Sequence, residues 1–190
     1  DGTIDSNGYF VPDQSGITTV SAAYGQVIES VNITVTAGNP VQLVVVPLSI
    51  TLTADDIFDL TVLEVIDVNG NVVPGELITI DITNGTFLQG ATWDGLIQAY
   101  STSTPVNQVS WEPWTAGTQW MNISWVAPDG TISAVNIEIT VETGAPNYFV
   151  ITGSNTIEAG NNTMLDVDVY DQRGNLKDRS TSGVLTWGAS

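Results

Sequence analysis

The sequence contains no cysteine and no histidine. Disulfide bonds and thiolate chemistry are therefore excluded, as are the common zinc sites and the histidine-based catalytic triads. Basic residues are scarce: three Lys and Arg stand against 21 Asp and Glu, for a formal net charge of −18. Because nucleic acids and anionic lipids are bound through Lys and Arg, this charge argues against both as partners. The basic residues are Arg173, Lys177 and Arg179.

Long apolar runs and helical periodicity are also missing. No apolar run approaches the roughly 20 residues that a membrane-spanning helix needs. No initiating Met or signal peptide is present, so we expect a processed product or an excised segment. No window of about 11 residues follows the period of a helix. Apolar residues still make up 42 % of the chain, which is enough to form real cores.

The sequence instead contains short alternating segments separated by turns. Clear turns are expected at Asp5-Ser6-Asn7-Gly8 and at Asn84-Gly85, and residues 87–114 should form short strands and long loops. This spacing of strands and turns predicts an all-β chain and favours β-sandwiches. The strands are expected at 9–11, 20–24, 29–36, 41–46, 49–53, 60–68, 76–83, 119–126, 133–141 and 148–151.

One five-residue motif occurs twice, each time directly after an alternating apolar strand. The copies are Asp67-Val68-Asn69-Gly70-Asn71 and Asp171-Gln172-Arg173-Gly174-Asn175. The motif predicts a tight turn, because Gly adopts a positive φ without strain and an Asp side chain can accept hydrogen bonds from the turn's own amides. The two copies begin 104 residues apart, at Asp67 and Asp171, which indicates that the chain repeats one kind of domain.

Two further landmarks align the halves of the chain. Gly16 to Tyr24 matches Gly117 to Trp125, and Val35 to Pro40 matches Val141 to Pro146. A Gly-x-Pro segment ends one strand and starts the next with few contacts across it, so it marks a domain boundary. We therefore expect one complete domain at 39–144, the C-terminal half of a domain at 1–38 and the N-terminal half of another at 145–190.

The two halves are complementary, and each alone would expose an apolar strand edge. Three arrangements follow from this. The chain is a window of a longer array, or residues 1–38 of one copy complete residues 145–190 of the next, or the halves pair within one chain. The second arrangement makes copies of the chain its own partners, head to tail, and produces a filament because the contact does not close.

The sequence resembles bacterial-type immunoglobulin-like (Big) domains, which occur in invasin- and intimin-like adhesins and in surface-layer proteins. The resemblance lies in the Pro-started strands, in the strands that run into the Asp-x-x-Gly-Asn turns, and in the pattern of the first 22 residues. It implies tandem immunoglobulin-like β-sandwiches that act as spacer or lattice modules on the cell exterior, without catalysis. The Pro-started strands are Pro40-Val41-Gln42-Leu43 and Pro146-Asn147-Tyr148-Phe149.

Acidic turns are candidate Ca²⁺ sites, because oxygen atoms from loops suit this ion. The principal candidate ligands are Asp55, Asp56, Asp59, Asp67 and Asn69. A second candidate site is the turn that holds Asp1, Asp5 and Asn7. Neither spacing matches a complete EF-hand loop, and the alternative is that these are solvated turn carboxylates.

Trp111 and Trp114 flank a Pro in an expected loop, so they are candidates for stacking against sugars. The alternative is that they pack in a core, as we expect for Trp125 and Trp187. Paired carboxylates for glycoside hydrolysis lack any compact motif. Lys177 with Ser180 or Ser182 is interpreted as a solvated turn rather than a catalytic dyad.

Four Asn-x-Ser/Thr glycosylation sequons fit an exported glycoprotein, at Asn32, Asn84, Asn122 and Asn161. Together these features predict a non-enzymatic extracellular structural protein, a repeating unit of a cell-surface layer or filament. The alternative is an adhesin or carbohydrate-binding module that uses its exposed Trp residues.

Overall fold

The computed structural model describes residues 2–88, 96–101, 109–180 and 188, and all of its regular elements are β-strands, as the sequence predicts. These described residues contain no helical segment that could span a membrane. The strands are β1 (Gly2–Ile4), β2 (Phe10–Pro12), β3 (Gly16–Tyr24), β4 (Val27–Val35), β5 (Pro40–Val46), β6 (Ser49–Thr53), β7 (Phe58–Asp59), β8 (Val62–Asp67), β9 (Leu77–Ile82), β10 (Thr86–Phe87), β11 (Leu96–Tyr100), β12 (Ser110–Glu112), β13 (Gly117–Val126), β14 (Ile132–Glu142), β15 (Pro146–Gly153), β16 (Leu165–Asp171) and β17 (Leu176–Ser180).

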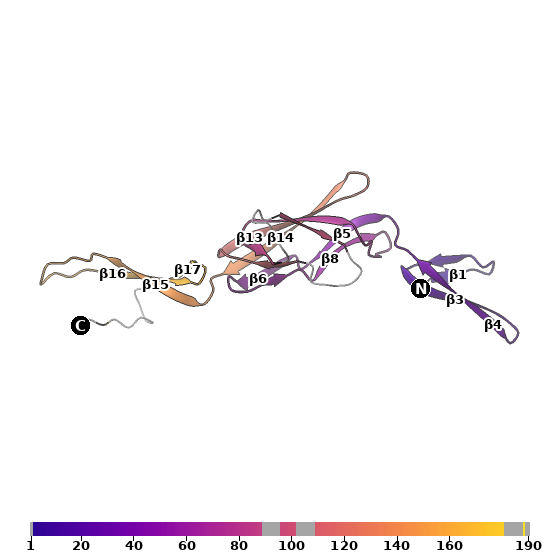
Figure 1. The fold of residues 1–190 in the computed structure, drawn as a ribbon, viewed down its shortest axis with the longest axis horizontal. Helices are drawn as coiled ribbons and strands as arrows, with labels where there is room; N and C mark the ends of the chain where they lie inside the picture. The colour runs from indigo at the N-terminus through magenta and orange to yellow at the C-terminus, as the bar shows by residue number, and fades with distance from the viewer. Residues whose placement is uncertain (1, 89–95, 102–108, 181–187, 189–190) are drawn as a thin grey trace.

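The strands form three units that follow one another along an elongated molecule (Figure 1). We call them the N-terminal unit (β1–β4), the central unit (β5–β14) and the C-terminal unit (β15–β17). The N-terminal and C-terminal units lie at opposite ends of the molecule (Figure 1), so they do not pair with each other within this structure. Two Gly-x-Pro segments connect the units: linker 1 (residues 38–40) and linker 2 (residues 144–146).

The central unit has three sheets around one core. A five-stranded sheet has the order β11-β9-β13-β14-β6, and the other sheets are β5-β8 and β10-β12-β7. Alternation explains the packing: along β13 the side chains of Met121, Ile123 and Trp125 are buried, while that of Asn122 between them is exposed. Ile123 lies directly opposite Ile80 of β9, and neither side chain is exposed. Burying each such Ile contributes about 1.5–3 kcal/mol of transfer free energy.

The end units repeat strand pairings of the central unit in the same register. Gly16 lies opposite Val35 in the β3–β4 hairpin, and their counterparts Gly117 and Val141 lie opposite each other in β13–β14. Pro40 lies opposite Asp67 in β5–β8, and Pro146 lies opposite Asp171 in β15–β16, each pair followed by a register shift. The sequence landmarks therefore mark structurally equivalent strands.

Candidate functional site

The first Asp-x-x-Gly-Asn motif forms a tight turn at the end of β8. The Gly70 amide donates to the Asp67 carbonyl at 3.1 Å, and Gly70 adopts a φ of 82°. The Asp67 Oδ1 atom accepts hydrogen bonds from the amides of Asn69 at 2.9 Å and Asn71 at 2.8 Å. The predicted interaction of the Asp side chain with its own turn is confirmed.

The other carboxylate oxygen of Asp67 reaches outside the turn. Its Oδ2 atom accepts a hydrogen bond of 2.7 Å from the Gly38 amide of linker 1 and one of 3.0 Å from the Asn71 side-chain amide. The side chain of Asp67 is only 2 % exposed. A buried carboxylate is stable only when hydrogen bonds satisfy it, and the linker supplies one of them.

The second motif repeats this arrangement at linker 2. Asp171 Oδ1 accepts hydrogen bonds from the amides of Arg173 at 2.9 Å and Asn175 at 2.8 Å. Asp171 Oδ2 accepts from the Gly144 amide at 2.9 Å and from the Asn175 side chain at 2.8 Å. Asp171 is fully buried. The same carboxylate therefore binds its own turn and the linker glycine in both places.

The last residue of each motif contacts the preceding unit. Asn71 Oδ1 accepts a hydrogen bond of 2.8 Å from the Ser15 amide, just before β3. Asn175 Oδ1 accepts one of 2.9 Å from the Ala116 amide, just before β13. We call the combined Asp–linker and Asn–preceding-unit contacts a junction clasp. Each clasp connects a turn of one unit to the linker and to the body of the unit before it.

Hydrogen bonding holds both carboxyl groups in the ionised form. The pKa of Asp67 is lowered to about 2, and the hydrogen bond from the Gly38 amide is the largest cause. Burial opposes this shift, whereas the hydrogen bonds from Asn71 and Asn69 add to it. Burial raises the pKa of Asp171, but the hydrogen bonds from Asn175, Gly144 and Arg173 outweigh it, so the net shift is downward. Both clasps therefore carry a negative charge at neutral pH.

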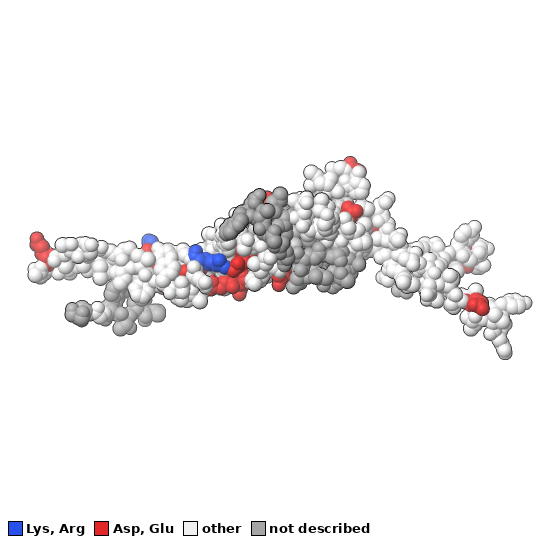
Figure 2. All heavy atoms as spheres, in the orientation of Figure 1, with Lys and Arg blue, Asp and Glu red and all other residues white. Residues whose placement is uncertain are grey.

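Among the described residues, the second clasp makes polar contacts that have no counterpart at the first clasp. Asp55 Oδ2 accepts a hydrogen bond of 2.8 Å from the Ala145 amide, and Lys177 Nζ donates one of 2.7 Å to the Gly144 carbonyl. Arg173 forms an ion pair with Glu112. In Figure 2, basic atoms lie beside acidic atoms near the boundary between the central and C-terminal units. In the first clasp the positions of Arg173, Lys177 and Glu112 are occupied by Asn69, Val73 and Val11, respectively, which carry no charge.

The structure does not bring the predicted calcium ligands together. Asp67 and Asn69 belong to the first clasp, whereas Asp55 binds linker 2. Asp56 accepts hydrogen bonds from the amide and hydroxyl of Thr53, and Asp59 accepts one from Ser110. Within the described residues no three acidic side chains gather at a point that could hold a metal ion. The predicted grouping is therefore wrong: each of these carboxylates serves a separate local contact.

The second candidate cation turn is partly described. Asp5 Oδ1 accepts hydrogen bonds from the amides of Asn7 at 2.9 Å and Tyr9 at 2.8 Å, so its carboxylate closes its own turn. Hydrogen bonds, first among them that of the Tyr9 amide, lower the pKa of Asp5. Asp1 lies outside the described residues.

The predicted sugar-stacking role of Trp111 is wrong, because its side chain is only 1 % exposed. Trp111 Nε1 donates a hydrogen bond of 2.8 Å to the Asn84 carbonyl, and the ring packs edge-on against Phe58.

Trp114 is half-buried, and its carbonyl accepts a hydrogen bond from Asn175 of the second clasp. Trp125 is buried in the core as predicted. Trp187 lies outside the described residues.

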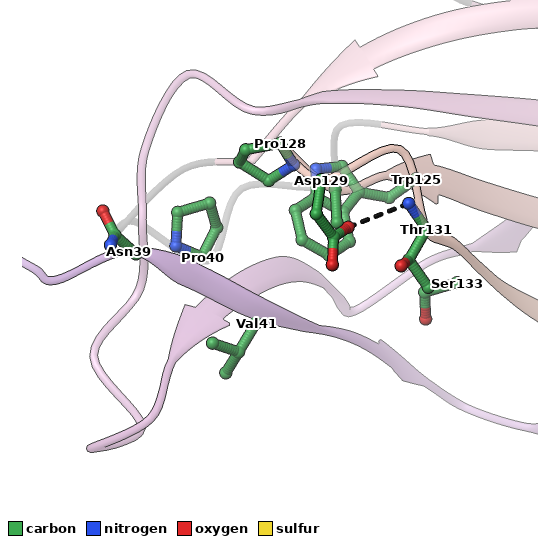
Figure 3. A pocket seen from close by; sticks show the side chains of 9 residues that line it. Asn39, Pro40, Val41, Trp125, Pro128, Asp129, Thr131 and Ser133 are labelled. Carbon is green, nitrogen blue, oxygen red and sulfur yellow. Dashed lines mark hydrogen bonds between the residues drawn. The ribbon is translucent and has the colours of Figure 1, made fainter.

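A shallow hollow of about 410 Å³ lies beside linker 1 (Figure 3). Pro40, Pro128 and Trp125 form much of its wall, but Trp125 is only 2 % exposed and its Nε1 atom donates to Glu76 at 2.9 Å. Asp129 in this wall accepts a hydrogen bond from the Thr131 amide (Figure 3). The hollow thus presents little aromatic face and only one carboxylate to a ligand.

The remaining predicted positions are distributed over the surface. Asn32, Asn122 and Asn161 of the sequons are exposed, and Asn84 is half-buried. Lys177 is exposed to solvent as expected, but it lies in β17 rather than in a turn, and its Nζ atom donates to the Gly144 carbonyl of linker 2. The neighbouring Ser182 lies outside the described residues.

No known protein family matches the chain, and no curated protein matches it. A solved structure of surface layer protein SbsC, domains 4–9, is similar at 19 % sequence identity and a TM-score of 0.34. The match covers 92 % of this chain and 27 % of that chain, so the chain spans about a quarter of its length. A likeness this distant carries no argument, and the functional conclusion rests on the junction clasps.

Proposed function

We propose that the chain is a non-enzymatic structural protein of the cell exterior, built from repeating immunoglobulin-like β-sandwich units that hold a fixed spacing in a surface layer or filament. The observation that carries this proposal is the junction clasp, which occurs twice with the same atoms in the same roles. A site that recurs between units, rather than inside one of them, is expected of a device for holding units together.

The clasp gives the linker a defined direction. A Gly-x-Pro linker has few contacts of its own and would otherwise allow the units to swing. The Asp carboxylate fixes the linker glycine, and the Asn side chain fixes the body of the preceding unit, so two independent contacts limit rotation. Charge-assisted hydrogen bonds to a carboxylate are among the stronger ones in proteins. The units therefore act as a stiff rod rather than as beads on a flexible chain.

The surface chemistry supports an extracellular location. A formal net charge of −18 keeps a crowded array of copies soluble and repels anionic polymers. The absence of cysteine leaves the fold independent of the redox state of its surroundings. We propose that Asn32, Asn122 and Asn161, whose side chains are exposed, are the sequons used for glycosylation.

Immunogold labelling of intact cells of the source organism tests this function. An antibody against the 190-residue chain should label the outer surface of unpermeabilised cells in a continuous coat or along filaments. Brief protease treatment of whole cells should remove the label, and an antibody against a cytoplasmic protein provides the control for intact membranes. Labelling that appears only after permeabilisation would contradict the proposal.

A further inference from the structure

The outer edge of β14 shows how this repeat completes its sheet. In the central unit, β6 adds to that edge in parallel, with Thr51 opposite Thr140 and Leu52 opposite Val141. In the N-terminal unit the equivalent strand is β4, and its only described partner is β3. The outer edge of β4 thus carries no strand among the described residues, although the fold of the central unit provides one.

A segment of the C-terminal unit repeats the sequence of β6. Residues 156–159 are Thr-Ile-Glu-Ala, and residues 51–54 of β6 and the following turn are Thr-Leu-Thr-Ala. The turns that follow agree as well: the Asp56 amide donates to the Thr53 carbonyl, and the Asn161 amide donates to the Glu158 carbonyl, both at 3.0 Å. Residues 154–158 nevertheless form no strand. Ile157 is 48 % exposed, whereas the equivalent Leu52 is 8 % exposed.

The apolar faces of the end units show the same incompleteness. In the N-terminal unit, Tyr24 is 92 % exposed, while its counterpart Trp125 in the central unit is 2 % exposed. In the C-terminal unit, Phe149 is 59 % exposed, while its counterpart Leu43 is 5 % exposed. Each end unit therefore presents the half of a core that the central unit buries against its other half.

We propose that the N-terminal unit of one copy of this chain binds the C-terminal unit of a second copy, and that residues 154–158 of the second copy add in parallel to β4 of the first. The register follows from the central unit, with Thr34 opposite Thr156 and Val35 opposite Ile157. Main-chain hydrogen bonds of the added strand supply affinity, and burial of Ile157 and Phe149 sets the register. This inference rests on the proposed function, because it extends the same repeating unit across the contact between copies.

Cysteine cross-linking tests the register directly, because the chain has no cysteine of its own. A chain with Thr34→Cys is mixed with a differently tagged chain that carries Thr156→Cys, under mild oxidation. Cysteines on neighbouring parallel strands are held close together, so the mixed disulfide should form at least about tenfold faster than with Thr163→Cys. Thr163 is also an exposed threonine and lies outside the proposed strand. Equal rates for the two pairs would overturn the proposal.

Sedimentation equilibrium tests the apolar part of the contact. The chain should associate with increasing concentration, and Ile157→Asp should remain monomeric where the unmodified chain associates. Val68→Asp is the matched control, because Val68 is 82 % exposed and lies outside the proposed contact. An unmodified chain that stays monomeric, or an intrachain disulfide in the Thr34→Cys/Thr156→Cys double variant, would overturn the proposal. The proposed function has its own test in the cell-surface labelling, which does not depend on this contact.

Discussion

Asp67 and Asp171 are the residues on which the arrangement of the units depends. Each is a buried carboxylate with four hydrogen-bond donors, and one donor in each set comes from a linker glycine. Burying an ionised group is unfavourable unless such donors replace water. The folded state therefore keeps the linker glycine in place, because releasing it would leave a buried charge incompletely satisfied.

The pKa of Asp67 predicts the pH range of the first clasp. Its folded pKa of about 2 lies below the ordinary value of 3.8, so the ionised form stabilises the folded clasp. This contribution is complete above the ordinary value and is lost as the pH falls through about 2. NMR titration of the Asp67 carboxyl carbon and the Gly38 amide should show both shifting together in this low range. Asp129, whose pKa is lowered mainly by the Thr131 amide, is the control without a linker contact. A Gly38 amide that stays constant while Asp67 titrates would contradict the interpretation.

Gly85 is a second residue whose identity the packing fixes. Its φ is +102°, and an added Cβ would overlap Trp111 Nε1 and the Glu112 carbonyl. Gly130 has a similar φ of +86° with open space around the added atom. Its substitution by Ala therefore measures the free-energy cost of the backbone conformation alone. In chemical denaturation, Gly130→Ala should destabilise the fold by about 1 kcal/mol. Gly85→Ala should cost about 1–3 kcal/mol more, as overpacking does. Equal losses for the two variants would show that the contact with Trp111 is unimportant.

At the scale of strands and turns, much of the fold follows from local sequence. Alternation places β13 and β14, and the turn chemistry of the Asp-x-x-Gly-Asn motif predicts its own hydrogen bonds. The contact with the linker was not predictable in this way. Gly38 precedes Asp67 by 29 residues and Gly144 precedes Asp171 by 27, so no local rule connects them. The one available indication was that the Gly-x-Pro segment and the turn motif recur together.

The errors in the predicted sites have a common physical reason. Trp111 and Trp114 were assigned to a loop because their neighbourhood lacks clear alternation, but β12 pairs with β7 and β10 and carries Trp111 into the core. Asp55 and Asp67 are close in sequence, yet β6 and β8 belong to different sheets, and the two residues contact different linkers. Neither outcome could be predicted from neighbouring residues, because the sheet pairings that place these side chains join segments far apart in the sequence.

The two junctions should respond differently to changes of charge. Arg173→Gln removes the ion pair with Glu112 and should loosen only the second junction, because the first has Asn69 at the matching position. The side chains of Arg173 and Glu112 are 30 % and 28 % exposed, and an ion pair that reaches solvent contributes at most about 1 kcal/mol. Hydrogen exchange of the Gly144 amide should therefore accelerate only a few-fold. Arg179→Gln is the matched control, since Arg179 pairs with Asp168 inside the C-terminal unit. Equal acceleration in both variants, measured by NMR hydrogen exchange, would contradict this assignment.

At the scale of the whole molecule, the clasps turn three units into one extended body (Figure 1). Asp67 and Asn71 of the first clasp are not members of the apolar core cluster of the central unit, yet the two clasps set the direction in which each unit follows the last. The second clasp, with its contacts from Asp55 and Lys177, should be the stiffer of the two. The length and straightness of the molecule thus depend on a few polar side chains at the linkers.

Electron–electron distance measurement across the second junction tests this account most directly. Spin labels on cysteines introduced at the exposed Thr140 and Thr163, diluted with unlabelled chain, report the arrangement of the central and C-terminal units. We expect one narrow distance distribution, which broadens in Asp171→Asn and in Gly144→Ala, whose added Cβ would overlap the Asp55 carboxylate. The control Asp129→Asn should leave it unchanged. A distribution that is already broad in the unmodified chain, and equal in all variants, would contradict the claim that the clasp fixes the units.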